Sequence, residues 1–239
     1  MEEPLMTQLV EQESAKAARI LSSARELILK RGFKAVTIAS IAERAHVGKG
    51  TVYLYWPTKE DLAVGLFGRD FLAAMERFAE LIGADPTLAR PERMIPSLIT
   101  ALSERPFMHA IQTGDEELLG ALTQHPRTRE LLDMAGPGAL VTVALPVWRK
   151  HGLARTDWAA QDQEYALRAL LLGFFAVTDR PSVFVRDLAV EDPAAVLART
   201  VTTLLGPFTA TEQDVEATAQ EALRLLDEYR RNILASLTA

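Results

Sequence analysis

The sequence predicts an all-α protein, in which a small N-terminal domain of three helices is joined by a long fourth helix to a larger helical C-terminal domain. Apolar residues recur every three or four positions through most of the 239 residues. Helix-capping residues and helix breakers occur where such helices should begin and end. Between residues 88 and 206 no alternating run is long enough for a strand. We assign residues 1–13 to a flexible arm, 14–62 to the first domain and 63–239 to the second.

The composition excludes several kinds of chemistry. The chain has no cysteine, so disulfides, thiolate metal sites and a thiol nucleophile are excluded. Its histidines lack the i, i+4 spacing of a metal-binding pair, and we expect neither a metal nor a cofactor. The acidic N-terminus has no apolar run like that of a secretory signal, and no apolar stretch approaches the roughly 18 residues of a membrane span. We therefore expect a cytoplasmic protein.

Charge is distributed unevenly along the chain. The whole chain carries a formal charge of −6 at pH 7. Residues 14–60 contain nine Lys or Arg against three acids, so this segment carries +6 and the remainder carries −12. A basic segment in an acidic protein is typical of a chain whose basic segment alone meets phosphate. Because this segment coincides with the predicted first domain, it favours a nucleic-acid partner.

Two helices of the first domain follow from their apolar spacing and their ends. Residues 14–31 form an amphipathic pattern that Gly32 ends, with two cations in the last turn. Thr37 can then cap a second helix over 38–45.

A turn at 46–48 leads into the third helix. This helix begins at Lys49, with Gly48 as its N-cap, and ends near Trp56 because Pro57 cannot lie in a helix interior. Val52 and Trp56, four residues apart, are predicted to face the core. Two short helices joined by a tight turn are the pattern of a helix-turn-helix.

The fourth helix begins at Thr58, with Asp61 in the capping-box position. Apolar residues continue it for about 24 residues to Gly83, roughly 36 Å at the helical rise. A helix of that length must leave the small first domain and enter the second.

Later helices are marked by their caps and breakers. Prolines such as Pro96 and Pro146 are expected to divide the region into shorter helices. Thr156 and Asp157 are expected to cap a helix from Trp158 to about residue 177. Further helices are expected over 192–205, with Asp192 as cap and Pro193 at the first position, and over 211–237, with a capping box of Thr211 and Asp214.

The third helix and its flanks carry the side chains that DNA recognition needs. Glycines let a backbone approach DNA, a lysine can reach a guanine edge or a phosphate, and hydroxyls mostly find phosphate. Helix N-termini favour phosphate through their free N–H groups. Since Tyr53 and Tyr55 cannot both face inward, at least one is assigned to DNA. The candidate DNA-binding residues are Thr37, Gly48, Lys49, Gly50, Thr51, Tyr53, Tyr55 and Lys59.

The stretch TIASIAERAHVGKGTVYLYWPTKEDL, residues 37–62, resembles the N-terminal domain of TetR/AcrR-family transcriptional regulators. That family follows roughly T-x-x-x-I-A-x-x-A-G-V-S-x-G-T-x-Y-x-Y-F-x-S-K-E-x-L. The resemblance places seven of the eight candidates, all except Gly48, where family members touch DNA. The sequence departs from the pattern at His46, where glycine is usual, at Gly48, where a capping Ser or Thr is usual, and at Leu54, where the residue is often polar.

The second domain contains candidates for contacts to a small molecule. The resemblance implies that a small, often apolar ligand binds between its helices. Large or polarizable side chains on those helices are suited to such a ligand, although an ordinary core has the same helical spacing. The candidates are Phe71, Met75, Phe78, Phe107, Met108, Met134, Trp148 and Phe174.

A homodimer on double-stranded DNA is expected. One helix-turn-helix covers a half-site too short for genomic specificity, whereas a two-fold dimer doubles it on a palindromic operator. The helices near 158–177 and 192–205 resemble the family's dimer interface in their position and order. A central core helix of a monomer is the alternative explanation of the apolar run from 166 to 177.

These observations predict a sequence-specific DNA-binding regulator, with no catalytic residues. The resemblance makes it a repressor that a small apolar ligand releases from its operator. Two alternatives stay open: a DNA-binding regulator without an effector, and a helical enzyme or carrier that keeps a relic DNA-binding domain. The acids at 115–117 are the densest cluster an enzyme could use, and they equally suit the start of a helix.

Overall fold

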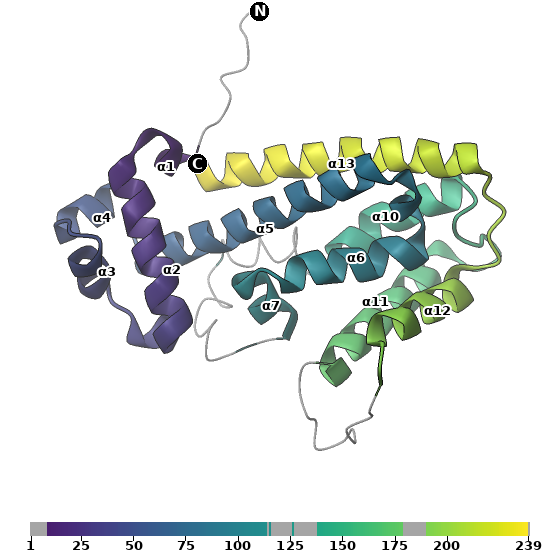
Figure 1. Cartoon of the computed structure of the whole chain (residues 1–239), viewed down its shortest axis with the longest axis horizontal. Helices are drawn as coiled ribbons and strands as arrows, with labels where there is room; N and C mark the ends of the chain where they lie inside the picture. Colours follow the sequence, from purple (N-terminus) through teal and green to yellow (C-terminus); the bar gives the residue numbers. More distant parts are fainter. Residues whose placement is uncertain (1–8, 114, 116–125, 127–137, 179–189, 239) are drawn as a thin grey trace, which may run out of the picture. The chain divides into compact units, whose positions relative to one another are not determined.

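The computed structural model describes residues 9–113, 115, 126, 138–178 and 190–238. All regular structure in these residues is helical (Figure 1), which confirms the predicted all-α class. None of the described helices combines the length and the apolar character that crossing a membrane requires. Met134 and the acids at 116–117 lie outside the described residues.

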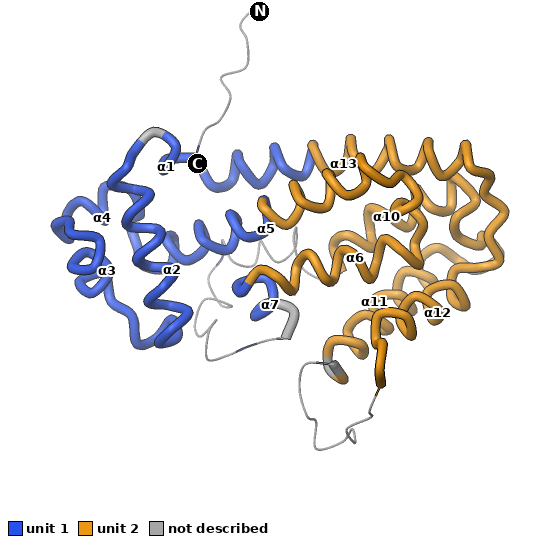
Figure 2. The backbone as a smooth tube through the Cα atoms, in the orientation of Figure 1, with its two compact units in different colours: residues 1–72, 106–132, 228–239 blue, residues 73–105, 133–227 orange. Residues whose placement is uncertain are grey.

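The chain forms two compact units that interleave along the sequence (Figure 2). Unit 1 comprises residues 1–72, 106–132 and 228–239, and unit 2 comprises 73–105 and 133–227. Helix α5, Lys59–Ala84, contributes residues to both units. The boundary that the sequence places near residue 62 stays a prediction.

Unit 1 contains the three helices predicted for the first domain. Helix α2 packs against α3 and α4, and Gly32 interrupts α2 with φ 73°, at the residue predicted to end it. Its other helices are a short segment in the predicted arm, the first part of α5, α7 and the last part of α13. The bounds are α1 Val10–Glu13, α2 Ala15–Ala35, α3 Ile38–Arg44, α4 Lys49–Tyr55 and α7 Pro106–Thr113.

Unit 2 is a stack of longer helices. Helix α6 packs against α12, and α11 packs against both α10 and α12. The buried indole of Trp148 donates a hydrogen bond from Nε1 to the carbonyl of Ala89 at 3.0 Å. The bounds are η1 Pro86–Ala89, α6 Pro91–Ser103, α10 Ala139–Lys150, α11 Ala160–Thr178, α12 Pro193–Leu205 and α13 Glu212–Thr238, of which α13 belongs to unit 2 up to residue 227.

The predicted helix ends in unit 2 have mixed outcomes. Asp192 caps α12 by accepting from the Ala195 N–H at 2.9 Å, and the capping box that opens α13 forms as predicted. The predicted start of α11 is wrong, because the Asp157 carboxylate pairs with Arg155 and the helix begins at Ala160.

The predicted division at two prolines is also wrong. Pro96 lies inside α6 and Pro146 lies inside α10. A proline in a helix removes one hydrogen bond, and the packing of these helices against their neighbours outweighs that loss.

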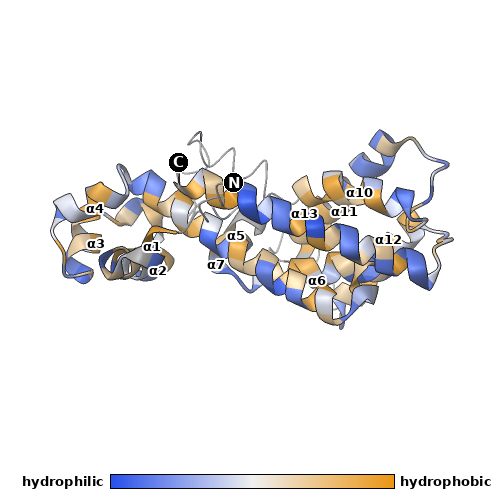
Figure 3. Ribbon diagram, turned by 90° about the horizontal axis from the view of Figure 1, so that it is seen from above, coloured by the Kyte–Doolittle hydropathy of each residue, from blue (hydrophilic) through white to orange (hydrophobic). Residues whose placement is uncertain are grey.

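Helix α13 shows the amphipathic pattern that the sequence predicts. Hydrophilic and hydrophobic stretches alternate along its ribbon in Figure 3, and Val215, Ala219 and Ile233 are buried.

Candidate nucleic-acid interface

The N-terminus of α3 is capped as the sequence predicts. The hydroxyl of Thr37 accepts a hydrogen bond from the Ser40 N–H at 3.1 Å, and the Ser40 hydroxyl accepts one from the Thr37 N–H at 3.1 Å. This reciprocal box satisfies two N–H groups that a helix start leaves without partners. Thr37 stays exposed, at the N-cap of the helix that precedes α4.

The turn after α3 is a Schellman motif. The His46 N–H donates to the Glu43 carbonyl at 3.1 Å, and the Val47 N–H donates to the Ala42 carbonyl at 2.9 Å. This motif needs a left-handed residue in the position that His46 occupies, and glycine is favoured there. His46 adopts φ 54°, so it takes the conformation of the glycine that the family pattern has there.

Helix α4 has one buried side and one open side. Val52 is fully buried and Trp56, the residue that ends the helix, is 6% exposed, as the sequence predicts. Gly48 is the N-cap and supplies no side-chain hydrogen bond. Lys49 is exposed, and a Cβ added to Gly50 would meet nothing within 4 Å. Within the described part of the chain, the open side of α4 is therefore exposed and another molecule can contact it.

The two tyrosines of α4 differ in their surroundings. Tyr53 is 51% exposed, and no described residue forms a hydrogen bond with its hydroxyl. Tyr55 is half-buried, and its hydroxyl shares a hydrogen bond with the Ser14 hydroxyl at 2.7 Å. Ser14 is the N-cap of α2, so Tyr55 ties the end of α4 to the start of α2.

Lys59 also has an internal role that the sequence did not reveal. Its Nζ donates to the carbonyls of Phe33 and Val36, each at 3.0 Å, and lies 4.0 Å from the centre of the Phe33 ring. A lysine on the carbonyls at a helix C-terminus is favoured by hydrogen bonding and by the helix dipole. In this structure the side chain links α5 to the end of α2, and its assignment to a DNA phosphate stays a prediction.

A buried ion pair fixes α2 to α5 a second time. The Asp70 carboxylate on α5 is 3% exposed and accepts from Arg25 of α2 at 2.6 Å. It also accepts from the Phe107 N–H at the start of α7, at 3.2 Å. The Asp70 side chain is 4% exposed and that of Arg25 is 34% exposed, so loss of Arg25 would leave a buried carboxylate without its charge partner. Asp70 therefore joins three helices of unit 1.

Of the predicted ligand-contact residues, one lines a groove, six are in the core and one lies outside the described residues. Phe174 lines a groove in unit 2 with a volume of about 430 Å³, between α6 and the start of α12. Six others are at most 2% exposed and line none of the described grooves, and Met134 lies outside the described residues. The six are Phe71, Met75, Phe78, Phe107, Met108 and Trp148.

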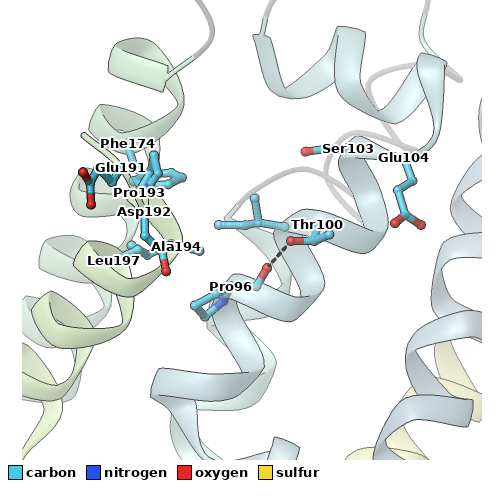
Figure 4. A pocket seen from close by; sticks show the side chains of 11 residues that line it. Pro96, Thr100, Ser103, Glu104, Phe174, Glu191, Asp192, Pro193, Ala194 and Leu197 are labelled. Atoms are coloured by element: carbon cyan, nitrogen blue, oxygen red, sulfur yellow. Dashed lines mark hydrogen bonds between the residues drawn. The ribbon is translucent and has the colours of Figure 1, made fainter. Parts of the chain in front are cut away.

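The groove has an apolar floor and acidic edges. Figure 4 shows Phe174, Pro193 and Leu197 on one side and Pro96 and Thr100 on the other. The carboxylates of Glu104 and Glu191 point away from the gap between these sides, and no Lys or Arg is among its lining residues. The shape suits an apolar ligand, and no cation in the lining is available for an anionic group. The sequence missed Pro96, Thr100 and Leu197, because two of them occupy ordinary positions on amphipathic helices and the third was interpreted as a breaker.

Exposed apolar side chains gather on α11 and α12. On α11, Tyr165 and Leu172 are 77% and 59% exposed, and on α12 Val196 is 41% exposed. Helices α11 and α12 pack against each other, so these side chains are candidates for a surface that another molecule covers. These are the helices that the sequence assigns to a dimer interface.

Comparison with known proteins gives a consistent result. The model described as "Bacterial regulatory proteins, tetR family" matches residues 20–66. The fatty acid metabolism regulator protein of Bacillus subtilis is 34% identical over 183 residues, which cover 67% of this chain and 92% of that protein. The transcriptional repressor KstR of Mycolicibacterium smegmatis is 33% identical over 105 residues, 43% of this chain and 51% of KstR. The chain thus spans about half the length of the KstR relatives it matches.

A solved structure shares the fold. The regulator FadR of Bacillus subtilis in complex with stearoyl-CoA aligns with a TM-score of 0.53 at 19% identity, covering 79% of this chain and 97% of that one. At this identity the likeness concerns the helical fold.

Proposed function

This chain belongs to the TetR family of bacterial regulatory proteins, and from that premise we propose that it is a DNA-binding transcriptional repressor which a small apolar ligand releases from its operator. The observation that carries the proposal is the open side of α4. Lys49 and Tyr53 are exposed there beside the bare backbone of Gly50, while Val52 and Trp56 fix the helix to the core. The proposal contains no catalytic step.

In this proposal α4 lies in the major groove. Lys49 donates to a guanine edge or to a phosphate, Tyr53 adds a hydroxyl, and Gly48 and Gly50 let the backbone come close. Thr37 and Thr51 contact phosphates. Tyr55 and Lys59 position the helices from inside, because their polar atoms already have partners in the protein.

The repressor acts as a homodimer on a palindromic operator. The exposed apolar side chains of α11 and α12 support this part of the proposal, because pairing two copies through them removes apolar surface from water. A dimer also presents two copies of α4 to two half-sites.

The ligand acts through α5. This helix holds α2 at two places, through Lys59 on the α2 carbonyls and through Asp70 on Arg25. A displacement of α5 therefore carries α2 with it, and with α2 the helix-turn-helix. The ligand shifts this equilibrium only by the difference of its affinity between the two arrangements.

The groove beside Phe174 is the candidate ligand site. Its apolar floor suits an acyl chain or another apolar group. Relatives named for fatty acid metabolism and for a stearoyl-CoA complex make acyl thioesters the first ligands to examine. The acidic edges of the groove favour holding the acyl chain there and leaving the phosphates of CoA outside.

The test begins with selection of bound DNA from a random pool. The selected operator is then titrated with the parent protein and with Lys49→Ala at several salt concentrations. Loss of a base or phosphate contact should weaken binding by about 5- to 150-fold per half-site, corresponding to roughly 1–3 kcal/mol for each contact. If Lys49 contacts phosphate, the salt dependence should also fall by about one ion per half-site.

The matched control is Lys150→Ala, a lysine of unit 2 whose side chain is 61% exposed and pairs with Glu221. It should leave operator affinity unchanged. A selection that enriches no sequence would overturn DNA recognition, and equal binding by the Lys49 variant would remove that residue from the interface. Stearoyl-CoA should release the parent from its operator, with free CoA as the comparison.

A further inference from the structure

Leu54 is the large hydrophobic side chain that the described residues leave most open to water. It is 83% exposed, against 51% for Tyr53 on the same helix and 40% for Leu29 on α2. It belongs to α4, where Val52 is fully buried two residues earlier. Exposure of a leucine is unfavourable, because burying its side chain would remove apolar surface from water.

The position of Leu54 on α4 is as informative as its exposure. At 3.6 residues per turn, Leu54 lies on the side of the helix opposite Val52 and Trp56. Gly50, four residues earlier, lies on the same outward side, with nothing within 4 Å of an added Cβ. The outermost surface of α4 is thus one isobutyl group beside a bare stretch of backbone.

The surroundings of Leu54 identify what meets it. It lies in a segment that carries +6 over residues 14–60, and the adjacent helix start carries Lys49. Such a surface attracts a polyanion. A polyanion that approaches α4 meets its outermost side chain, Leu54, first. An apolar side chain cannot donate to phosphate or to the polar edges of bases. The one apolar group that base pairs present in the major groove is the C5 methyl of thymine.

We propose that Leu54 contacts the C5 methyl group of a thymine in each operator half-site, and so makes the repressor select T·A at that position. The inference rests on the proposed docking of α4 in DNA and adds a specificity-determining residue to it. The contact is apolar, so it contributes to affinity without releasing counterions. Lys49 and Leu54 then have separable roles, one dependent on salt and the other independent of it.

The test removes the methyl group from the DNA and the isobutyl group from the protein. Each thymine of the selected operator is replaced in turn by deoxyuridine, which lacks only the C5 methyl. At one position per half-site the parent protein should bind about fourfold more weakly, as expected for one buried methyl group, and about 15-fold more weakly when both half-sites are changed. Leu54→Ala should bind the thymine and deoxyuridine operators equally.

Two further measurements separate this contact from other effects. The Leu54→Ala variant should keep the salt dependence of the parent, whereas a lost phosphate contact would lower it. Where cytosine replaces the critical thymine, 5-methylcytosine should restore about fourfold in affinity for the parent and none for the variant. Leu29→Ala, a second exposed leucine of unit 1, should keep full discrimination.

The outcomes distinguish the inference from its premise. If the parent selects an operator and no thymine shows discrimination that Leu54→Ala removes, the inference is wrong and the repressor proposal stands. If no DNA sequence is selected at all, the proposed function fails and this inference fails with it. Circular dichroism of Leu54→Ala should match the parent, because the Leu54 side chain is 83% exposed.

Discussion

The turns that end α3 and α10 have the same backbone and different residues at the critical position. After α10, the Gly152 N–H donates to Arg149 and the Leu153 N–H donates to Trp148, at 3.4 and 2.7 Å. These are the two bonds that His46 and Val47 make after α3. The left-handed residue is Gly152 with φ 69° in one turn and His46 with φ 54° in the other.

The space around each turn explains the difference. A Cβ on Gly152 would lie 2.7 Å from the Thr209 hydroxyl oxygen, and the Gly152 carbonyl accepts from the Thr209 N–H at 3.0 Å. His46 is exposed instead. A left-handed conformation costs a residue with a side chain roughly 1–2 kcal/mol. The turn after α10 avoids that cost because it has glycine. The turn between α3 and α4 has a residue that bears the cost, as strained residues at functional sites often do.

The largest effect should come from filling the α10 turn. Gly152→Ala adds left-handed strain and a contact that the Thr209 side chain must move to relieve, so unfolding free energy should fall by about 2–4 kcal/mol. Urea unfolding followed by circular dichroism measures it. Gly83→Ala is the matched control, because Gly83 lies in α5 and an added Cβ there meets nothing within 4 Å. A comparable loss of unfolding free energy in both variants would mean that the left-handed turn at Gly152 is not the cause of the loss.

Relieving the α3 turn should have a smaller effect of opposite sign. His46→Gly keeps both hydrogen bonds and removes the strain, so the protein should gain about 1 kcal/mol and its Tm should rise by about 2–4 °C. His46→Ala keeps a Cβ in the same conformation and should gain nothing. Operator affinity, measured on the same variants, should stay unchanged. If both variants bound the operator more weakly, the imidazole would be assigned a DNA contact. If the Tm of His46→Gly did not rise, the proposed strain at His46 would be wrong.

What the sequence predicted correctly is local. The caps at Thr37, Asp192 and Thr211, the glycine at the end of α2, and the inward direction of Val52 and Trp56 all follow from residues within four positions of each other. Such patterns depend on helix periodicity and on the N–H groups that helix starts leave free, and no distant partner changes them.

What the sequence missed depends on residues far apart in the chain. Lys59 meets α2 carbonyls more than twenty positions away, and Tyr55 meets Ser14 from 41 positions away. The sequence did not indicate a role for Asp70, an acid in an apolar helix. Because its carboxylate is buried, it needs Arg25 as a charge partner. A sequence motif assigns a role to a residue from its position in the family pattern. The partners of these side chains are determined instead by how the helices pack. The groove beside Phe174 was missed for the same reason, because helix pairing creates it.

The capping boxes of α3 and α13 extend the comparison to helix starts, where the effect should be smallest. In each, a threonine accepts from the N–H three residues on, but the third residue is neutral Ser40 in α3 and acidic Asp214 in α13. Thr37→Ala should cost about 1 kcal/mol, and it should also weaken operator binding. Thr211→Ala should lower stability by a similar order and leave operator binding unchanged.

The two variants should differ in their dependence on pH. The Thr211 hydroxyl and N–H donate to the Asp214 carboxylate and hold its pKa below the usual value of 3.8. A carboxyl group whose pKa is lowered by folding stabilises the protein above the unfolded pKa, and that contribution is lost as the pH falls through the folded pKa. The deficit of Thr211→Ala should therefore shrink as the pH is lowered below about 4, whereas Ser40 does not titrate and the deficit of Thr37→Ala should not change. Unfolding curves between pH 7 and pH 3 measure both, and a parallel decline in the two variants would show that charge does not distinguish the boxes.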